Sequence, residues 1–313
     1  MKKERSNLIE NSIYIIFTIL IALYLISICL VNLNGQQWYE YDIYADAMLS
    51  KNIAESGSLF PKNWTFGNQL YVFSTPTVAA SIYLFCKDPV LSISLSSCIM
   101  TFLTVLLFSW CIHPFTTKQG RIIGIFCIVG GVILGTSAAN DTTSLQLFYT
   151  MASYYACYLI GIFYTAGIWI RIYLNRSVSP YNFILCLAIH FALGIQSLRE
   201  MLVLNLPLCT LSVFVCLWNK QNKCRNNKSH MLFSFVALGS SFLGNAVRIF
   251  LTSSGKISQK TILEDVSHNF LENISKSFFA FIEFIGLTPT KSPLSIYIFC
   301  MLSCNYVGRY RLQ

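Results

Sequence analysis

Charged side chains are scarce in this chain of 313 residues. Asp, Glu, Lys and Arg make up 11% of the sequence, whereas hydrophobic residues make up 55%, and the mean hydropathy is +0.57. Soluble globular proteins carry roughly 25% charged residues. The apolar residues fall in long runs, which excludes a soluble protein built around one apolar core. The composition predicts an all-α, polytopic integral membrane protein.

Motifs for metal binding and disulfide bonding are also missing. The sequence has twelve cysteines, but nearly all lie inside apolar runs, and it contains neither a CxxC pair nor a Cys/His cluster. Cysteine in such runs acts as a small apolar residue. A structural zinc site and a disulfide framework are therefore not predicted.

Linkers, repeats and low-complexity tracts are absent as well, so residues 1–313 are interpreted as a single transmembrane domain. The net charge of +9 does not indicate a nucleic-acid partner. The basic residues stand in short clusters between apolar runs, which is the pattern of cytoplasmic loops in membrane proteins.

About eight transmembrane helices are predicted, since a span needs roughly 20 apolar residues. The first follows a basic N-terminus without a cleavage site, so it is interpreted as an uncleaved anchor. The run 183–217 is too long for one crossing, and the charged pair Arg199-Glu200 divides it at a tight hairpin, with this pair at the water interface. The predicted spans are 13–33, 90–112, 122–138, 147–170, 183–198, 201–217, 231–250 and a broken span in 277–307.

Lysine and arginine predict the orientation. The loops 113–121, 171–182 and 218–230 are basic and contain no acid, so we expect them and the N-terminus to lie on the cytoplasmic side. The alternate loops, including an amphipathic segment at 252–275, then face outward. Nearly all of the acids fall on that outer side, although acids contribute little to topology.

This orientation requires the apolar stretch 69–86 to remain on the outer side. The stretch contains Pro76, and its apolar run after the proline is short. We therefore expect a helix or hairpin in the outer interface, within an external juxtamembrane segment 34–89. The alternative is that 69–86 crosses the membrane, which would invert every later loop.

The richest cluster of acids in the chain lies just after the first span. It holds Glu40, Asp42 and Asp46 among tyrosines, in a sequence with only 13 acids. In a helix, Asp42 and Asp46 would stand one turn apart on the same face. Tyrosine suits a membrane–water boundary. The cluster is interpreted as a surface active site, and the alternative is a solvated loop.

The segment around this cluster resembles the first external loop of the GT-C superfamily of glycosyltransferases. The resemblance consists of Asp42, Ala45, the turn at Ile53-Ala-Glu-Ser-Gly57, Phe60-Pro61, the stretch Trp64–Gly67 and the apolar run that follows. It extends to about residue 112. It is most similar to the lipid A aminoarabinose transferase and protein O-mannosyltransferase branch, whose members take sugar from a polyprenyl-phosphate carrier.

The resemblance implies that Asp42 is the catalytic acid or base. The family has Glu at the next position, where this chain has Ile43, so Glu40 or Asp46 is the candidate for the second acid. A Lys-Pro-Pro helix of the family is replaced by Ser74–Thr77, which lacks its cation. The chain is shorter than such enzymes usually are, so a truncated member is expected.

Four further residues are candidates for substrate binding: Asp141, Arg199, Glu200 and Arg248. Asp141 could position an acceptor or a divalent cation, or cap a helix. Arg199 could bind a donor phosphate bidentately, or pair locally with Glu200 at the hairpin. Arg248 lies near the outer end of its span, where reaching the interface is its ordinary role. His190, inside a span, is interpreted as hydrogen-bonded across helices.

Together these features predict a glycosyltransferase of the cell membrane with its active site on the external face. Its donor would be a polyprenyl-phosphate sugar, and its acceptor would be a lipid, a glycan or a protein. Its one cofactor would be a divalent cation, Mg²⁺ or Mn²⁺. No residues are predicted to form a dedicated metal site. Two alternatives remain: a non-catalytic transport or lipid-flipping protein, and an inactive truncated fragment.

Overall fold

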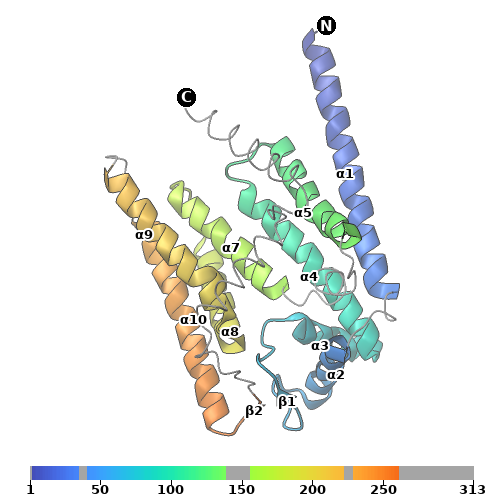
Figure 1. The fold of residues 1–313 in the computed structure, drawn as a ribbon, viewed down its shortest axis with the longest axis vertical. Helices are drawn as coiled ribbons and strands as arrows, with labels where there is room; N and C mark the ends of the chain where they lie inside the picture. The colour runs from blue at the N-terminus through green and yellow to red at the C-terminus, as the bar shows by residue number, and fades with distance from the viewer. Residues whose placement is uncertain (1, 35–40, 139–155, 222–227, 261–313) are drawn as a thin grey trace. The chain divides into compact units, whose positions relative to one another are not determined.

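The computed structural model describes residues 2–34, 41–138, 156–221 and 228–260, all within one compact unit, Met1–Lys260 (Figure 1). This part of the chain is almost entirely helical. Its elements are α1 (Lys2–Asn34), α2 (Tyr41–Ser56), β1 (Thr65–Phe66), α3 (Thr75–Cys86), α4 (Pro89–Ile112), α5 (Lys118–Ala138), α7 (Ala156–Tyr173), α8 (Pro180–Gln196), the π-helix η3 (Met201–Asn205), α9 (Leu206–Gln221), α10 (Ser229–Ser253) and β2 (Ser258–Gln259).

Five of the described helices are long and apolar enough to cross a membrane. They contain the spans Tyr14–Asn34, Pro89–Ile112, Ala156–Tyr173, Met201–Lys220 and Ser229–Ser253. Two other predicted spans are helical: α5 covers 122–138, and α8 is a shorter apolar helix over 183–198. The predicted span in 277–307 lies outside the described residues. The all-α fold is confirmed, while the count of eight spans stays a prediction.

Two shorter helices, α2 and α3, follow α1 and precede α4 in the chain. They lie at the lower end of Figure 1. At about 1.5 Å per residue, the 12 residues of α3 extend about 18 Å, which is less than the apolar thickness of a bilayer. Lys87 ends α3 in the left-handed conformation (φ 58°). The Asp88 carboxylate then caps α4 by accepting hydrogen bonds from the backbone N–H groups of Val90 and Leu91. This tight turn is what keeps α3 short.

Segments far apart in the sequence meet at the end of the bundle that carries α2 and α3. β1 pairs with β2 in parallel, with Thr65 opposite Ser258. The Leu70 backbone N–H donates to the Gln196 carbonyl at the end of α8, at 2.9 Å. The prediction has 34–89, the Arg199-Glu200 turn and 252–275 facing outward. At this end of the bundle, described parts of the first and last of these segments meet the end of α8, which closely precedes Arg199.

The basic loops meet at the opposite end of the helices. Arg171, near the end of α7, donates to the carbonyl of Trp110 at 2.8 Å, and Arg176 donates to the carbonyl of Pro114 at 3.1 Å. The side chains of Tyr173 and His230 pack edge to face with ring centres 5.6 Å apart. The described parts of the three basic loops therefore lie at one end of the bundle, as the charge pattern predicted.

Glycine residues bring α8 and α10 into backbone contact. A Cβ atom on Gly194 would lie 2.3 Å from the Ser241 carbonyl oxygen, and one on Gly244 would lie 2.2 Å from the Phe191 carbonyl oxygen. No side chain fits at such distances. Small residues at a helix interface are the usual means of close packing inside membranes, where apolar burial alone does not drive association.

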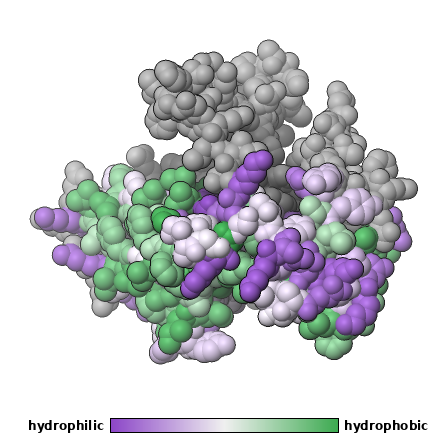
Figure 2. All heavy atoms as spheres, turned by 90° about the horizontal axis from the view of Figure 1, so that it is seen from below, coloured by the Kyte–Doolittle hydropathy of each residue, from purple (hydrophilic) through white to green (hydrophobic). Residues whose placement is uncertain are grey.

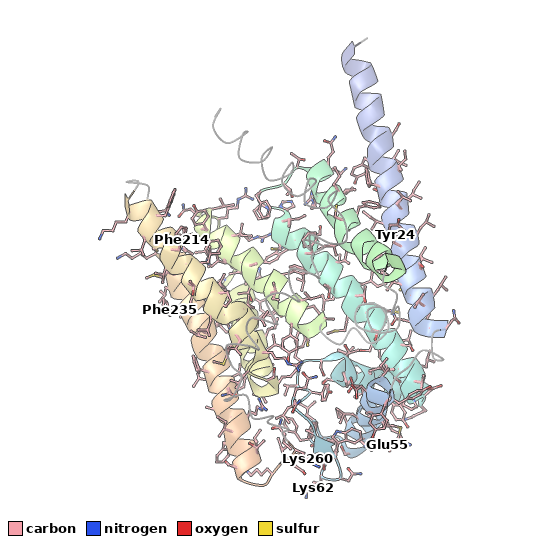
Figure 3. The ribbon with its side chains drawn as sticks, viewed as in Figure 1. Tyr24, Glu55, Lys62, Phe214, Phe235 and Lys260 are labelled. Carbon is pink, nitrogen blue, oxygen red and sulfur yellow. The ribbon has the colours of Figure 1, made fainter. Side chains whose placement is uncertain are left out.

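The surface divides into apolar sides and a polar end. Phe214 on α9 and Phe235 on α10 are 60% and 48% exposed on the sides of their helices, whereas Glu55, Lys62 and Lys260 lie at the lower end (Figure 3). Figure 2 views this lower end and shows hydrophilic residues over its middle and right. Apolar side chains exposed along long helices indicate contact with lipid, so the described chain is consistent with a multi-pass membrane protein.

Candidate functional site

A pocket of about 490 Å³ opens at the end of the bundle that carries α2. Its lining comes from three parts of the chain: the start of α2, the segment 64–71, and Arg199 after α8. Pockets that bind small molecules usually measure 300–1,000 Å³. The lining residues are Tyr41, Asp42, Ala45, Asp46, Trp64, Thr65, Gly67, Asn68, Gln69, Tyr71 and Arg199.

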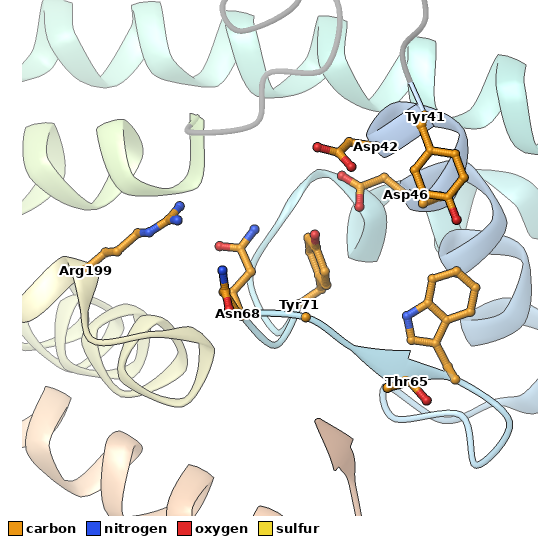
Figure 4. Close-up of a pocket in the computed structure, with 11 residues that line it drawn as sticks. Tyr41, Asp42, Asp46, Thr65, Asn68, Tyr71 and Arg199 are labelled. Atoms are coloured by element: carbon orange, nitrogen blue, oxygen red, sulfur yellow. The ribbon is translucent and has the colours of Figure 1, made fainter. Parts of the chain in front are cut away.

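Charges of opposite sign face each other across this pocket. Figure 4 shows Asp42 and Asp46 on one wall and the extended side chain of Arg199 on the other. The two aspartates belong to successive turns of α2, as their spacing predicted. An anionic group could therefore bind at Arg199 while a second group lies beside the carboxylates.

The two aspartates have different environments. Asp42 is exposed, whereas Asp46 is 7% exposed. Burial, which disfavours the charged form, raises the pKa of Asp46 from 3.8 to about 7. A hydrogen bond from the Tyr71 side chain works against this shift, and the negative charge of Asp42 adds to it. Asp46 therefore exchanges a proton near neutral pH, the range in which a general base is most effective.

The floor of the pocket is held by long-range hydrogen bonds. The Tyr158 hydroxyl donates to Gln69 Oε1 at 3.3 Å, and the Gln259 side chain donates to the Gly67 carbonyl at 2.8 Å. Arg248 donates to the Asn68 carbonyl at 3.4 Å. Arg248 was a candidate substrate ligand. It supports the floor of the pocket from outside and does not line the pocket.

An apolar cluster lies beneath the same floor. It joins residues of α2, β1, α3 and α8 with Ile257, which precedes β2. Its fully buried members include Leu49, Phe66 and Leu70. A rigid layer of this kind holds the polar side chains above it in place, which is a requirement for a binding or catalytic site.

Glu200 faces away from the pocket although it follows Arg199 in the sequence. Its side chain is buried between helices, where it hydrogen-bonds to His190, Asn205 and Ser241. The predicted hairpin would leave Glu200 at the water interface. It is instead 2% exposed, because the helix that begins at Arg199 turns this carboxylate toward α8 and α10. His190 also contacts Thr165 of α7, so it is bonded across helices as predicted.

Two predicted site residues cannot be placed. Glu40 and Asp141 lie outside the described residues. The lining side chains Asn68, Gln69 and Tyr71 were not predicted from the sequence. The adjacent amides of Asn68 and Gln69 stand just before an apolar run, and this pattern is the signal that could have identified them.

The described residues do not form a metal site by themselves. Among the described residues, no group of three or more His, Cys, Asp and Glu side chains could hold a metal ion. The pocket does offer carboxylate and amide oxygens, the ligands that hard divalent cations prefer. Mg²⁺ commonly uses one or two carboxylates and completes its shell with water and substrate phosphate.

Comparison with known proteins gives no relative: no family model, curated protein or solved structure matches this chain.

Proposed function

We propose that this protein is a membrane glycosyltransferase that moves a sugar from a polyprenyl-phosphate donor to an acceptor hydroxyl or amine. The proposal starts from the resemblance of residues 34–112 to the GT-C superfamily. The observation that carries it is the pocket in which Asp42, Asp46 and Arg199 face each other. The sequence alone marks all three residues as candidates, and they come from two distant segments.

The acidic wall supplies the acid–base chemistry in this proposal. Asp42 is exposed to the pocket and removes the proton of the acceptor, whose oxygen or nitrogen then attacks the anomeric carbon of the sugar. The bond between that carbon and the phosphate oxygen breaks, and polyprenyl phosphate leaves. Asp46 lies one turn further along α2, and its proton exchange near neutral pH lets it receive the proton from Asp42.

Arg199 assists the leaving group. Negative charge grows on the bridging oxygen as the sugar–phosphate bond breaks, and a guanidinium group placed there lowers the energy of the transition state. Arginine matches phosphate with two parallel N–H···O bonds. Arg199 lies at the end of a helix, where the phosphate head of a polyprenyl phosphate could bind. The prenyl chain would then lie along the apolar sides of the helices.

A divalent cation, Mg²⁺ or Mn²⁺, is part of the proposal as a ligand shared with the donor. Asp42 and the amide oxygens of Asn68 and Gln69 are the groups that would hold it. When bound, it would neutralise phosphate charge. The carboxylates and Arg199 provide the rest of the chemistry.

The proposal places the pocket on the external face of the cell membrane, with the N-terminus in the cytoplasm. Its support is that contacts group the loops as the Lys and Arg distribution requires. A reporter fused at Lys87 tests it: we expect an external readout, and a cytoplasmic readout would overturn the orientation.

The decisive experiment measures sugar transfer by the purified full-length protein in liposomes. The donors are labelled polyprenyl-phosphate hexoses and pentoses, offered with membrane lipid and peptide acceptors. Asp42→Asn should lower the transfer rate at least a hundredfold, in line with the loss of a general base. Glu55→Gln is the matched control, because it removes another acid of α2 that does not line the pocket. Equal rates for wild type and Asp42→Asn would reject the mechanism.

A transport function is the second candidate, and one observation favours it. Glu200 and His190 form an ionisable pair buried between helices, and such pairs inside a membrane often carry protons or ions. Asp42→Asn and a second variant, Glu200→Gln, separate the two functions. A transporter would lose activity with Glu200→Gln and keep it with Asp42→Asn, whereas the glycosyltransferase would be inactivated by Asp42→Asn.

A further inference from the structure

A second pocket, of about 490 Å³, lies at the other end of the bundle. It forms where the C-terminal ends of α4 and α7 meet the start of α5, and it is lined by Arg121, Arg171, Arg176 and His113. Tyr158 at the start of α7 contacts the first pocket and Arg171 near its end lines the second, so roughly 20 Å of helix separates them. The second pocket is therefore distinct from the proposed active site.

The charge of this second pocket is entirely positive. None of the residues that line it carries a carboxylate, although three carry guanidinium groups. Arginines placed close together repel each other unless an anion lies between them. Such an arrangement recognises a phosphate group, to which guanidinium binds bidentately.

One of the three arginines is fixed in position. Arg171 donates to the carbonyls of Gly167 and Trp110, each at 2.8 Å, and its guanidinium lies 3.6 Å from the centre of the Trp110 ring. These bonds occupy two of its five N–H donors. The remaining donors can bind a ligand without the loss of entropy that a flexible side chain would undergo.

The wall of the pocket continues into an apolar stripe on α4. Leu106 lines the pocket and is 65% exposed. Ile99 and Phe102 are also exposed, and all three lie on one face of the helix with His113. The stripe runs along the predicted span away from the arginines. A ligand that fits both parts has an anionic head and an apolar tail.

We propose that this second pocket binds an anionic phospholipid, with the phosphate among Arg121, Arg171 and Arg176 and an acyl chain along the α4 stripe. Because no carboxylate is present to bind a choline or ethanolamine ammonium group, the pocket selects lipids with a net negative head, such as phosphatidylglycerol. The role is independent of glycosyl transfer and of the membrane orientation.

The test uses the purified full-length protein in detergent micelles, where orientation plays no part. Binding of phosphatidylglycerol, phosphatidylcholine and inorganic phosphate is measured by native mass spectrometry and by thermal stabilisation. We expect phosphatidylglycerol to bind most tightly. The double variant Arg121→Gln/Arg176→Gln should weaken its binding by about thirtyfold, since each basic residue at an anionic lipid head contributes roughly a fivefold to sixfold change.

The variants are chosen so that misfolding does not obscure the result. Arg171 is left intact because it makes two hydrogen bonds and lies against the Trp110 ring, whereas Arg176 makes a single exposed hydrogen bond, to the Pro114 carbonyl. Lys220→Gln is the control, since it removes an exposed positive charge of α9 outside the pocket. Equal binding of the two phospholipids, or undiminished phosphatidylglycerol binding by the double variant, would reject the site. Binding of inorganic phosphate as tight as that of phosphatidylglycerol would reject a lipid as the ligand.

Discussion

Arg199 and Glu200 are neighbours in sequence but serve two different regions of the protein. Arg199 lines the pocket that also contains Asp42 and Asp46, whereas the Glu200 carboxylate is buried and bonded to His190 Nδ1. The break at Ser197 and Leu198 between two helices makes this division possible. One short turn therefore supplies both a candidate substrate ligand and a bond that ties α8 to the next helix.

Glu200 and its partners His190, Asn205 and Ser241 should contribute to stability more than to binding. His190→Ala would leave a buried carboxylate without its main partner, and we expect it to lower the free energy of unfolding by about 1–2 kcal/mol, as measured for polar contacts between membrane helices. Denaturant titration of the purified protein measures this. Donor affinity should change little, and a large loss of affinity with unchanged stability would contradict the structural role.

Gly244 should not tolerate a side chain. Gly244→Ala would place a Cβ atom 2.2 Å from the Phe191 carbonyl oxygen, so α8 and α10 would have to separate. Overpacking of this kind costs roughly 1–3 kcal/mol or more. Gly239→Ala on the same helix is the control, because nothing lies within 4 Å of its added Cβ. Thermal denaturation should distinguish the two variants, and equal melting temperatures would contradict the packing.

Stability should fall as pH rises toward neutrality because of Asp46. Its pKa is about 7 in the folded protein and near 4 in an unfolded chain. Between these values the folded state holds a proton that the unfolded state has released, so the free energy of unfolding decreases as pH rises. Asp46→Asn removes this dependence and should raise the melting temperature at pH 8 relative to wild type. An unchanged pH profile would contradict the assignment.

The same carboxyl should shape the activity profile. If Asp46 must be ionised to accept a proton from Asp42, kcat/KM for sugar transfer rises through about pH 7. Asp46→Asn should lower the rate and flatten this rise. A rise that persists in the variant would assign the ionisation to another group.

Arg199 should act on the donor phosphate. Arg199→Gln is expected to weaken donor binding or slow transfer by roughly tenfold to a hundredfold, the usual effect of losing a charge-assisted hydrogen bond. Arg199→Lys should restore only part of this, because an ammonium group lacks the planar pair of donors. Kinetics with a range of donor concentrations separates the two effects. Full activity of Arg199→Gln would remove this residue from the site.

Local spacing predicted some features of this protein well. The pairing of Asp42 with Asp46 follows from the geometry of one helix, and the helical apolar runs follow from the length of the spans. By contrast, the contacts of Asn68 with Arg248 and of Gln69 with Tyr158 join residues far apart in the chain. The burial of Glu200 depends on partners supplied by α8 and α10. Such contacts leave no periodic pattern in the sequence.

The pairing of β1 with β2 has a consequence for the biogenesis of this protein. Thr65 and Ser258 are separated by 193 positions, yet their hydroxyl groups lie 3.3 Å apart beside the pocket floor. During synthesis the first wall of the pocket leaves the ribosome long before its last support. Contacts at such sequence separation form late, so the nascent protein would carry an unfinished pocket through most of its membrane insertion. A ribosome stalled before residue 258 should expose segment 64–71 to protease, and release of the later residues should protect it.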